Sequence, residues 1–182
     1  MQRRSEAVQI CAFDTSFGRC AMSWNSGGLI SLVLPTSSAK SLEQAVKEKS
    51  SRVSCLEFDK VQSPKDPMTK RTIALVNSYF EGKPVDFSPI ELNWHGLSEF
   101  SKSVLGTLRD LPSGETITYG ELAAKAGHSG ASRATGTALS NNPFPIIVPC
   151  HRVIRSDGSL GQFSAWGGEK TKQKLLKLEG AI

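Results

Sequence analysis

The residue types best suited to covalent chemistry stand side by side at Cys150 and His151, which follow the apolar residues 146–148 and Pro149. A thiolate attacks soft carbon electrophiles well, but a free cysteine has a pKa of about 8.5 and is mostly protonated at neutral pH. His151 could take that proton through a water, because side chains adjacent in sequence often point apart. The pair therefore predicts a cysteine nucleophile with a histidine base.

The same pair also fits a buried cysteine beside a hydrogen-bonded histidine, because free cysteines are commonly buried and inert. Pro143, Pro145 and Pro149 precede the pair and predict a rigid, non-helical segment. Rigidity favours the reactive interpretation, but the pair by itself leaves both interpretations open.

The other three cysteines, Cys11, Cys20 and Cys55, all precede residue 56. None of the four stands in a C-x-x-C pair, and four cysteines in 182 residues are too few for a disulfide scaffold. We therefore expect an intracellular protein with free thiols, in which these three cysteines are packing residues and no metal is bound.

Length and composition limit the class of protein. The 182 residues allow one ordinary domain or two small ones, and 38% hydrophobic with 21% charged residues argues against a disordered chain. No apolar run approaches the roughly 20 residues of a membrane-spanning helix. The net charge of +5 permits a polyanionic partner without establishing one.

The elements that must position the pair fall into two parts. In the first part, apolar and polar residues alternate, which predicts a meander of antiparallel strands joined by glycine turns. After the meander, apolar residues at helical spacing predict helices. Ser41 is the predicted N-cap of the first helix. The expected strands are 8–13, 18–24 and 29–34, with helices at 41–49 and 69–80 and a last strand and connector at 85–95.

The second part is mostly helical. A capping residue, Thr118, precedes an expected helix at 119–126, and a glycine-containing turn leads into another at 131–139, which together predict a helix-turn-helix. Further helices are expected at 97–111 and 170–178. We place the domains at residues 1–92 and 93–182.

Three segments resemble one known family. The stretch Asn142-Pro143-x-Pro145-x-x-x-Pro149-Cys150-His151-Arg152-Val153 resembles the active-site signature of the O6-alkylguanine-DNA alkyltransferases, also called methylated-DNA–protein-cysteine methyltransferases. The stretch Gly114-Glu115-Thr116-x-Thr118-Tyr119-Gly120-Glu121-Leu122-Ala123 resembles the first helix of their helix-turn-helix, and Arg133-Ala134-x-Gly136-x-Ala138 their recognition helix. Leu178-Glu179-Gly180 is similar to their last helix. The resemblance covers residues 97–180, and the N-terminal part is similar only in outline.

The resemblance implies an α+β protein. Its N-terminal α/β domain would contain an antiparallel, ribonuclease H-like sheet, and its C-terminal domain would be winged-helix-like. The implied function is DNA repair by a monomer without a cofactor. The protein would approach double-stranded DNA from the minor groove and flip out O6-alkylguanine, chiefly O6-methylguanine, with O4-methylthymine as a further candidate. The alkyl group would pass irreversibly to Cys150, in the cytoplasm of a bacterium or archaeon or in the nucleus of a eukaryote.

The resemblance also assigns catalytic roles. His151 would be the base, acting through a water, and Glu179 would orient it. Tyr119 would donate its hydroxyl hydrogen to the flipped base, and Asn142 would fix the turn before Cys150.

The remaining implied roles concern DNA and the substrate pocket. Arg133 would fill the place of the flipped nucleotide, and its small neighbours Ala134, Thr135 and Gly136 would let the helix approach DNA closely.

In the pocket, the carbonyls of Cys150 and Val153 would accept from the guanine amine, and the Ser164 N–H would reach the guanine oxygen. Phe163 stands where many members have tyrosine, in a loop, 162–168, that is longer than usual. Arg152 would pair with an acidic residue between the two parts.

Two other functions compete with repair. A helix-turn-helix regulator or alkylated-base sensor would bind DNA without transfer, although such relatives lack the acceptor cysteine that this chain has at 150. A cysteine hydrolase would use Cys150 and His151 but would not explain Arg133 and Tyr119.

Overall fold

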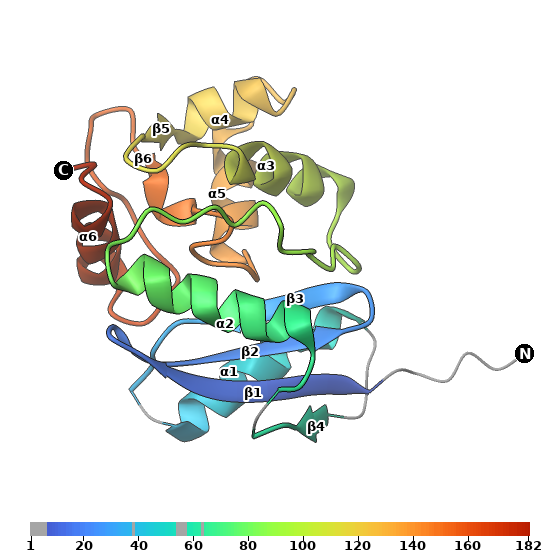
Figure 1. Cartoon of the computed structure of the whole chain (residues 1–182). Helices are drawn as coiled ribbons and strands as arrows, with labels where there is room; N and C mark the ends of the chain where they lie inside the picture. Colours follow the sequence, from blue (N-terminus) through green and yellow to red (C-terminus); the bar gives the residue numbers. More distant parts are fainter. Residues whose placement is uncertain (1–6, 38, 54–57, 63) are drawn as a thin grey trace, which may run out of the picture. The chain divides into compact units, whose positions relative to one another are not determined.

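The computed structural model describes residues 7–182 except 38, 54–57 and 63 (Figure 1). The chain divides into two compact units, an N-terminal unit, Met1–Gly96, and a C-terminal unit, Leu97–Ile182. The boundary predicted after residue 92 falls just before the end of the first unit. The interpretation of Cys55 as a packing residue lies outside the described residues.

The N-terminal unit is built on a four-stranded sheet. Its first three strands, β1 (Val8–Thr15), β2 (Gly18–Asn25) and β3 (Gly28–Val33), form the predicted antiparallel meander. Gly18 and Gly28 make the turns with φ of 123° and 107°, a backbone region that side chains with a Cβ rarely adopt.

A fourth strand, β4 (Phe58–Lys60), pairs parallel to β1, so that the strand order is β3-β2-β1-β4. The sheet is therefore mixed, and the expectation of a purely antiparallel sheet is wrong. The physical reason is the crossover through α1 (Ala39–Ser50), because a connection that passes through a helix returns the chain in the same direction. The helix is followed by a single 3-10 turn, Ser51–Val53.

Helix α1 covers one side of this sheet. Leu42 and Val46 join Ile10, Ala21 and Val33 in a buried cluster. The helix begins at Ala39, so Ser41 lies inside the first turn and is not the N-cap that the sequence predicted.

The second helix of the unit, α2 (Pro67–Phe80), begins two residues before the predicted start. Asp66 caps it, because its carboxylate accepts from the Thr69 N–H at 2.7 Å, and Pro67 suits the first turn. The strand expected at 85–95 does not form. Leu92 makes one isolated bridge with Leu29 on the sheet, and the rest of the segment is turn and connector.

The C-terminal unit is mostly helical, as predicted. Helix α3 (Glu99–Arg109) buries Val104, Leu105 and Leu108 and packs against the two helices of the helix-turn-helix. Those two helices are α4 (Tyr119–Lys125) and α5 (Ser132–Ser140), and α6 (Gly168–Leu178) is the last. A pair of short parallel strands, β5 (Ile117–Thr118) and β6 (Val153–Ile154), was not predicted.

Within the described part of the chain, no helix is both long enough and apolar enough to cross a membrane.

Candidate active site

The segment before Cys150 is held by the side chain of Asn142. Its Nδ2 donates to the Val148 carbonyl at 2.8 Å and to the Cys150 Sγ at 3.2 Å, while its Oδ1 accepts from the Phe144 N–H at 2.9 Å. Ile146 within the loop adopts a φ of 65°, an outlier for a β-branched residue. One buried amide thus ties together both ends of a strained loop and the sulfur itself.

Cys150 is buried, with 6% of its surface exposed, and begins a 3-10 turn, Cys150–Arg152. The prediction of a non-helical segment is therefore wrong at this point. The prolines end at Pro149, and Pro149 accepts from the Arg152 N–H at 2.9 Å, which closes the turn.

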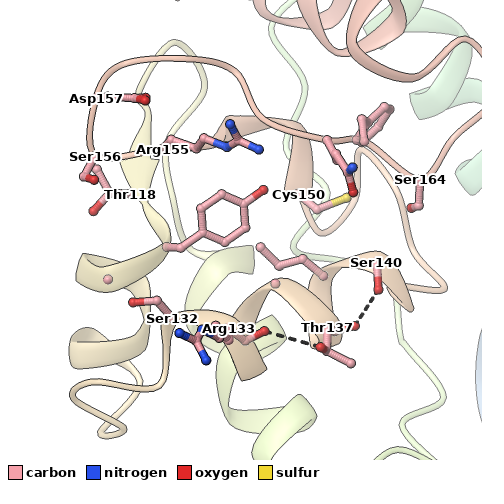
Figure 2. Close-up of a pocket in the computed structure, with 16 residues that line it drawn as sticks. Thr118, Ser132, Arg133, Thr137, Ser140, Cys150, Arg155, Ser156, Asp157 and Ser164 are labelled. Atoms are coloured by element: carbon pink, nitrogen blue, oxygen red, sulfur yellow. Dashed lines mark hydrogen bonds between the residues drawn. The ribbon is translucent and has the colours of Figure 1, made fainter.

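A cavity of about 790 Å³ opens onto Cys150 (Figure 2). Its walls come from the start of α4, from α5, from the residues after β6 and from the loop at 162–164. Of the residues assigned to the pocket, Phe163 and Ser164 line the cavity and Val153 does not. Val153 is fully buried, and its carbonyl accepts from Lys172 Nζ at 2.5 Å.

His151, the residue after the cysteine, belongs to a buried cluster of charged side chains. His151 Nε2 lies 2.7 Å from Glu179 Oε1, and the side chains are 0% and 2% exposed. Arg152 donates from Nε to Glu179 Oε2 at 2.8 Å and from Nη2 to Oε1 at 3.0 Å, and a third N–H donates to the Leu111 carbonyl. Arg152 therefore pairs within the C-terminal unit, and the prediction that it bridges the two parts is wrong.

The cluster sets the protonation state of His151. Burial lowers the pKa of His151, and the hydrogen bond to Glu179 opposes this shift without reversing it. A neutral imidazole with its Nε2–H directed at Glu179 leaves Nδ1 as the basic nitrogen.

Tyr119 is the first residue of α4 and lines the cavity. Its position is set by a capping box: Thr118 Oγ1 accepts from the Glu121 N–H at 3.2 Å, and Glu121 Oε2 accepts from the Thr118 N–H at 2.8 Å. Burial and the charge of Cys150 raise the pKa of Tyr119, and Arg155 opposes them. The phenol therefore stays protonated at neutral pH and can act as a donor.

The exposed face of α5 carries Arg133 and Ala134, and Gly136 lines the cavity. Thr135 is fully buried, and its hydroxyl has no hydrogen-bond partner among the described residues. The prediction that Thr135 forms part of a DNA-contacting surface is wrong, because a helix that presents Arg133 outward turns the residue two positions later toward the core.

Two residues near the cavity were not predicted. Lys172 is fully buried, and its Nζ donates to the Val153 carbonyl at 2.5 Å and to the Leu160 carbonyl. Burial lowers the pKa of Lys172 to about 8. Its spacing from Leu175 and Leu176 places it on the buried face of α6, a signal that the sequence did contain. Arg155 also lines the cavity, and no sequence pattern marked it.

Two further cysteines are described outside the cavity. Cys11 and Cys20 are buried free thiols whose pKa values burial raises to about 11 and about 12, as packing residues would show. Among the residues that the structure describes, no three His, Cys, Asp or Glu side chains are grouped so as to hold a metal ion.

The fold and site together define a class: an α+β protein whose helix-turn-helix unit encloses a buried cysteine at a cavity. The family model "6-O-methylguanine DNA methyltransferase, DNA binding domain" matches residues 99–181. A methylated-DNA–protein-cysteine methyltransferase of Mycobacterium leprae is 42% identical over 116 residues, which are 64% of this chain and 68% of the relative. This chain belongs to the methylated-DNA–protein-cysteine methyltransferase family.

The chain spans less than two thirds of the length of another relative. The methyltransferase of Methanothermobacter thermautotrophicus is 43% identical over 111 residues, 61% of this chain and 61% of the relative. The crystal structure of Mycobacterium tuberculosis OGT in complex with DNA is similar with a TM-score of 0.75 and 28% identity, over 95% of this chain and 93% of that one. The O6-methylguanine-DNA methyltransferase of Pyrococcus kodakaraensis KOD1 gives a TM-score of 0.69 and 27% identity, over 95% and 99%.

Proposed function

We propose that this protein repairs O6-methylguanine in double-stranded DNA by transferring the methyl group to Cys150. The observation that carries the proposal is a cysteine held by Asn142 at a cavity large enough for a nucleobase, next to a buried His151–Glu179 pair. The names of the matching relatives support the same activity.

The transfer balances as a displacement at carbon. His151, through a water, takes the proton of Cys150, and the thiolate sulfur forms a bond to the methyl carbon. The bond between that carbon and O6 breaks, and its electron pair leaves with guanine. Tyr119 donates a hydrogen bond to the base as this negative charge develops. No step regenerates Cys150, so each chain reacts once.

The substrate must leave the base stack, because its reacting carbon is otherwise enclosed in the duplex. Arg133, exposed on α5, would occupy the vacated position from the minor groove, where Ala134 and Gly136 add little bulk. The Ser164 N–H and the carbonyls of Cys150 and Val153 would recognise guanine, and Phe163 would contact the alkyl group. O4-methylthymine is a second substrate in this proposal.

The proposal has consequences for the protein's environment. A repair protein of this kind acts as a monomer without a cofactor, and it works where DNA is, in the cytoplasm of a bacterium or archaeon or in a nucleus. A sensor that binds without transfer is the alternative outcome.

The test is the intact mass of the protein after mixing with an oligonucleotide duplex that contains O6-methylguanine. Transfer adds one methylene equivalent, roughly 14 Da, on Cys150. The matched control is Cys20→Ser, which removes a thiol from the N-terminal unit and should still gain this mass. Binding with no mass gain would indicate a sensor, and methyl removal by Cys150→Ala would refute the assignment of the acceptor.

A further inference from the structure

Arg155 follows β6 directly, and its guanidinium points into the cavity, toward the side on which Cys150 lies (Figure 2). Its backbone is fixed by a tight turn, because its N–H donates to the Ser159 carbonyl at 2.9 Å and its carbonyl accepts from the Gly158 N–H at 3.0 Å. The side chain therefore projects from an anchored position.

The Arg155 side chain runs beside the proposed hydrogen-bond donor. A Cβ on Gly161 would lie 3.4 Å from the Tyr119 hydroxyl oxygen, 3.4 Å from Arg155 Cγ and 3.5 Å from Arg155 Nε. Both side chains thus pack against Gly161. Gly161 has a φ of 70°, a backbone conformation that favours glycine.

The positive charge of Arg155 is not neutralised by a close contact. Nothing in the described part of the chain forms a hydrogen bond or an ion pair with its guanidinium. The nearest acid in sequence, Asp157, instead accepts from the Ser159 N–H at 2.9 Å and from the Ser159 hydroxyl at 2.7 Å. The charge of Arg155 still helps to lower the pKa of Asp157. An anchored cation that makes no direct hydrogen bond or ion pair with the described residues, in a cavity, is suited to an anionic ligand.

The geometry points to Arg155 as the residue that binds the phosphate of the nucleotide rotated into the cavity and so positions it for transfer. This inference rests on the proposed function. Before reaction O6-methylguanine is neutral, so the phosphate is the anion that the nucleotide brings. Arg155 is exposed whereas Cys150 is buried, and a base that reaches Cys150 leaves its phosphate at the exposed end. The planar guanidinium matches two phosphate oxygens.

The first experiment compares two substrates in Arg155→Gln and wild type, with methylation of Cys150 followed by intact mass. One substrate is a duplex with O6-methylguanine, and the other is the free base O6-methylguanine, which has no phosphate. We expect the ratio of the duplex rate to the free-base rate to fall about tenfold or more. An unaltered ratio would overturn the inference, because Arg155 would then act on the base.

The second experiment does not need transfer. In a Cys150→Ser background, the affinity for the same duplex is measured against salt concentration. Loss of one phosphate contact should lower the slope of log affinity against log salt by about one in Arg155→Gln. Lys174→Gln is the matched control, because Lys174 is exposed on α6 and does not line the cavity, and it should keep the wild-type slope. Equal slopes in Arg155→Gln and the control would contradict the inference.

The two experiments separate the two proposals. If the wild type gains no methyl group from the duplex, the proposed function fails whatever Arg155 does. The salt slope still shows whether Arg155 contacts a phosphate.

Discussion

At the scale of single residues, Glu179 connects the reactive segment to the rest of its unit. It accepts from Arg152 through both carboxylate oxygens and lies 2.7 Å from His151 Nε2. A buried carboxylate with three such contacts both balances charge and orients the imidazole. Its removal should therefore affect chemistry and stability together.

Glu179→Gln should slow methyl transfer by about tenfold to a thousandfold, because the orientation of the base is lost. It should also cost about 3–5 kcal/mol of unfolding free energy, since Arg152 keeps a buried charge without its partner. Single-turnover rates and urea unfolding measure the two effects. Glu169→Gln, an exposed residue of the same helix, is the control. A rate equal to the wild type would remove Glu179 from the relay.

The pH dependence of stability tests the burial of His151. Burial lowers its pKa in the folded state, whereas the unfolded chain keeps a pKa of about 6.5. The unfolded state therefore binds more protons below that pH, and stability should be full above it and fall as the solution becomes more acidic. Urea unfolding between neutral pH and mildly acidic pH measures the slope. His151→Gln should reduce the slope, and the exposed His95→Gln should leave it. Equal slopes in both variants would contradict the prediction.

At the scale of elements, α4 and α5 each position one side chain of the cavity wall. Tyr119 begins α4 directly after its cap, and Arg133 lies in the first turn of α5. Both side chains depend on where a helix starts, so capping and helix position matter for function.

Thr118→Ala should destabilise the protein by about 1 kcal/mol, because the first turn of α4 loses its side-chain cap. Thr118→Ser keeps the hydroxyl and should cost less. Thermal unfolding compares the variants. If Thr118→Ala unfolds at the same temperature as Thr118→Ser, the capping box adds nothing measurable.

Arg133→Ala should slow transfer from a duplex more than transfer from a single-stranded oligonucleotide, because only the duplex requires a vacated position to be filled. Extrusion of a base costs a few kcal/mol, so we expect a loss of about tenfold to a hundredfold on the duplex. Single-turnover rates on both substrates give the comparison. A duplex rate equal to the wild type would show that another group replaces the flipped nucleotide.

At the scale of the whole molecule, the residues of the candidate site all lie in the C-terminal unit. Asn142 contacts Cys150 and Glu179 contacts His151 there, and the residues that line the cavity belong to the same unit. We therefore expect the C-terminal unit to carry the chemistry.

A fragment of residues 97–182 should fold and accept a methyl group on Cys150, because its helices bury their own core. Circular dichroism would show a cooperative transition, and intact mass would show the transfer. We expect a lower melting temperature than for the whole chain, since a smaller chain buries a smaller fraction of its surface. An unfolded fragment would mean that the N-terminal unit is required for folding.

Local patterns were sufficient for most elements. The three meander strands, the two helices around the glycine turn and the cap at Thr118 follow from period, turn chemistry and capping, which act between near neighbours. The missed strands have one kind of cause. The pairing of β4 with β1 and of β5 with β6 joins residues far apart in the chain, and segments as short as two or three residues have no period to detect.

The sequence by itself determined the residue types of the reactive segment and, through its motifs, the family. Tertiary structure decided which neighbours those residues have. It paired Arg152 with Glu179, turned Thr135 inward, buried Lys172 beneath the Val153 carbonyl and left the Arg155 guanidinium facing the cavity. The physical reason is that burial and charge pairing depend on distances in space between segments up to tens of residues apart. A linear pattern does not contain these distances.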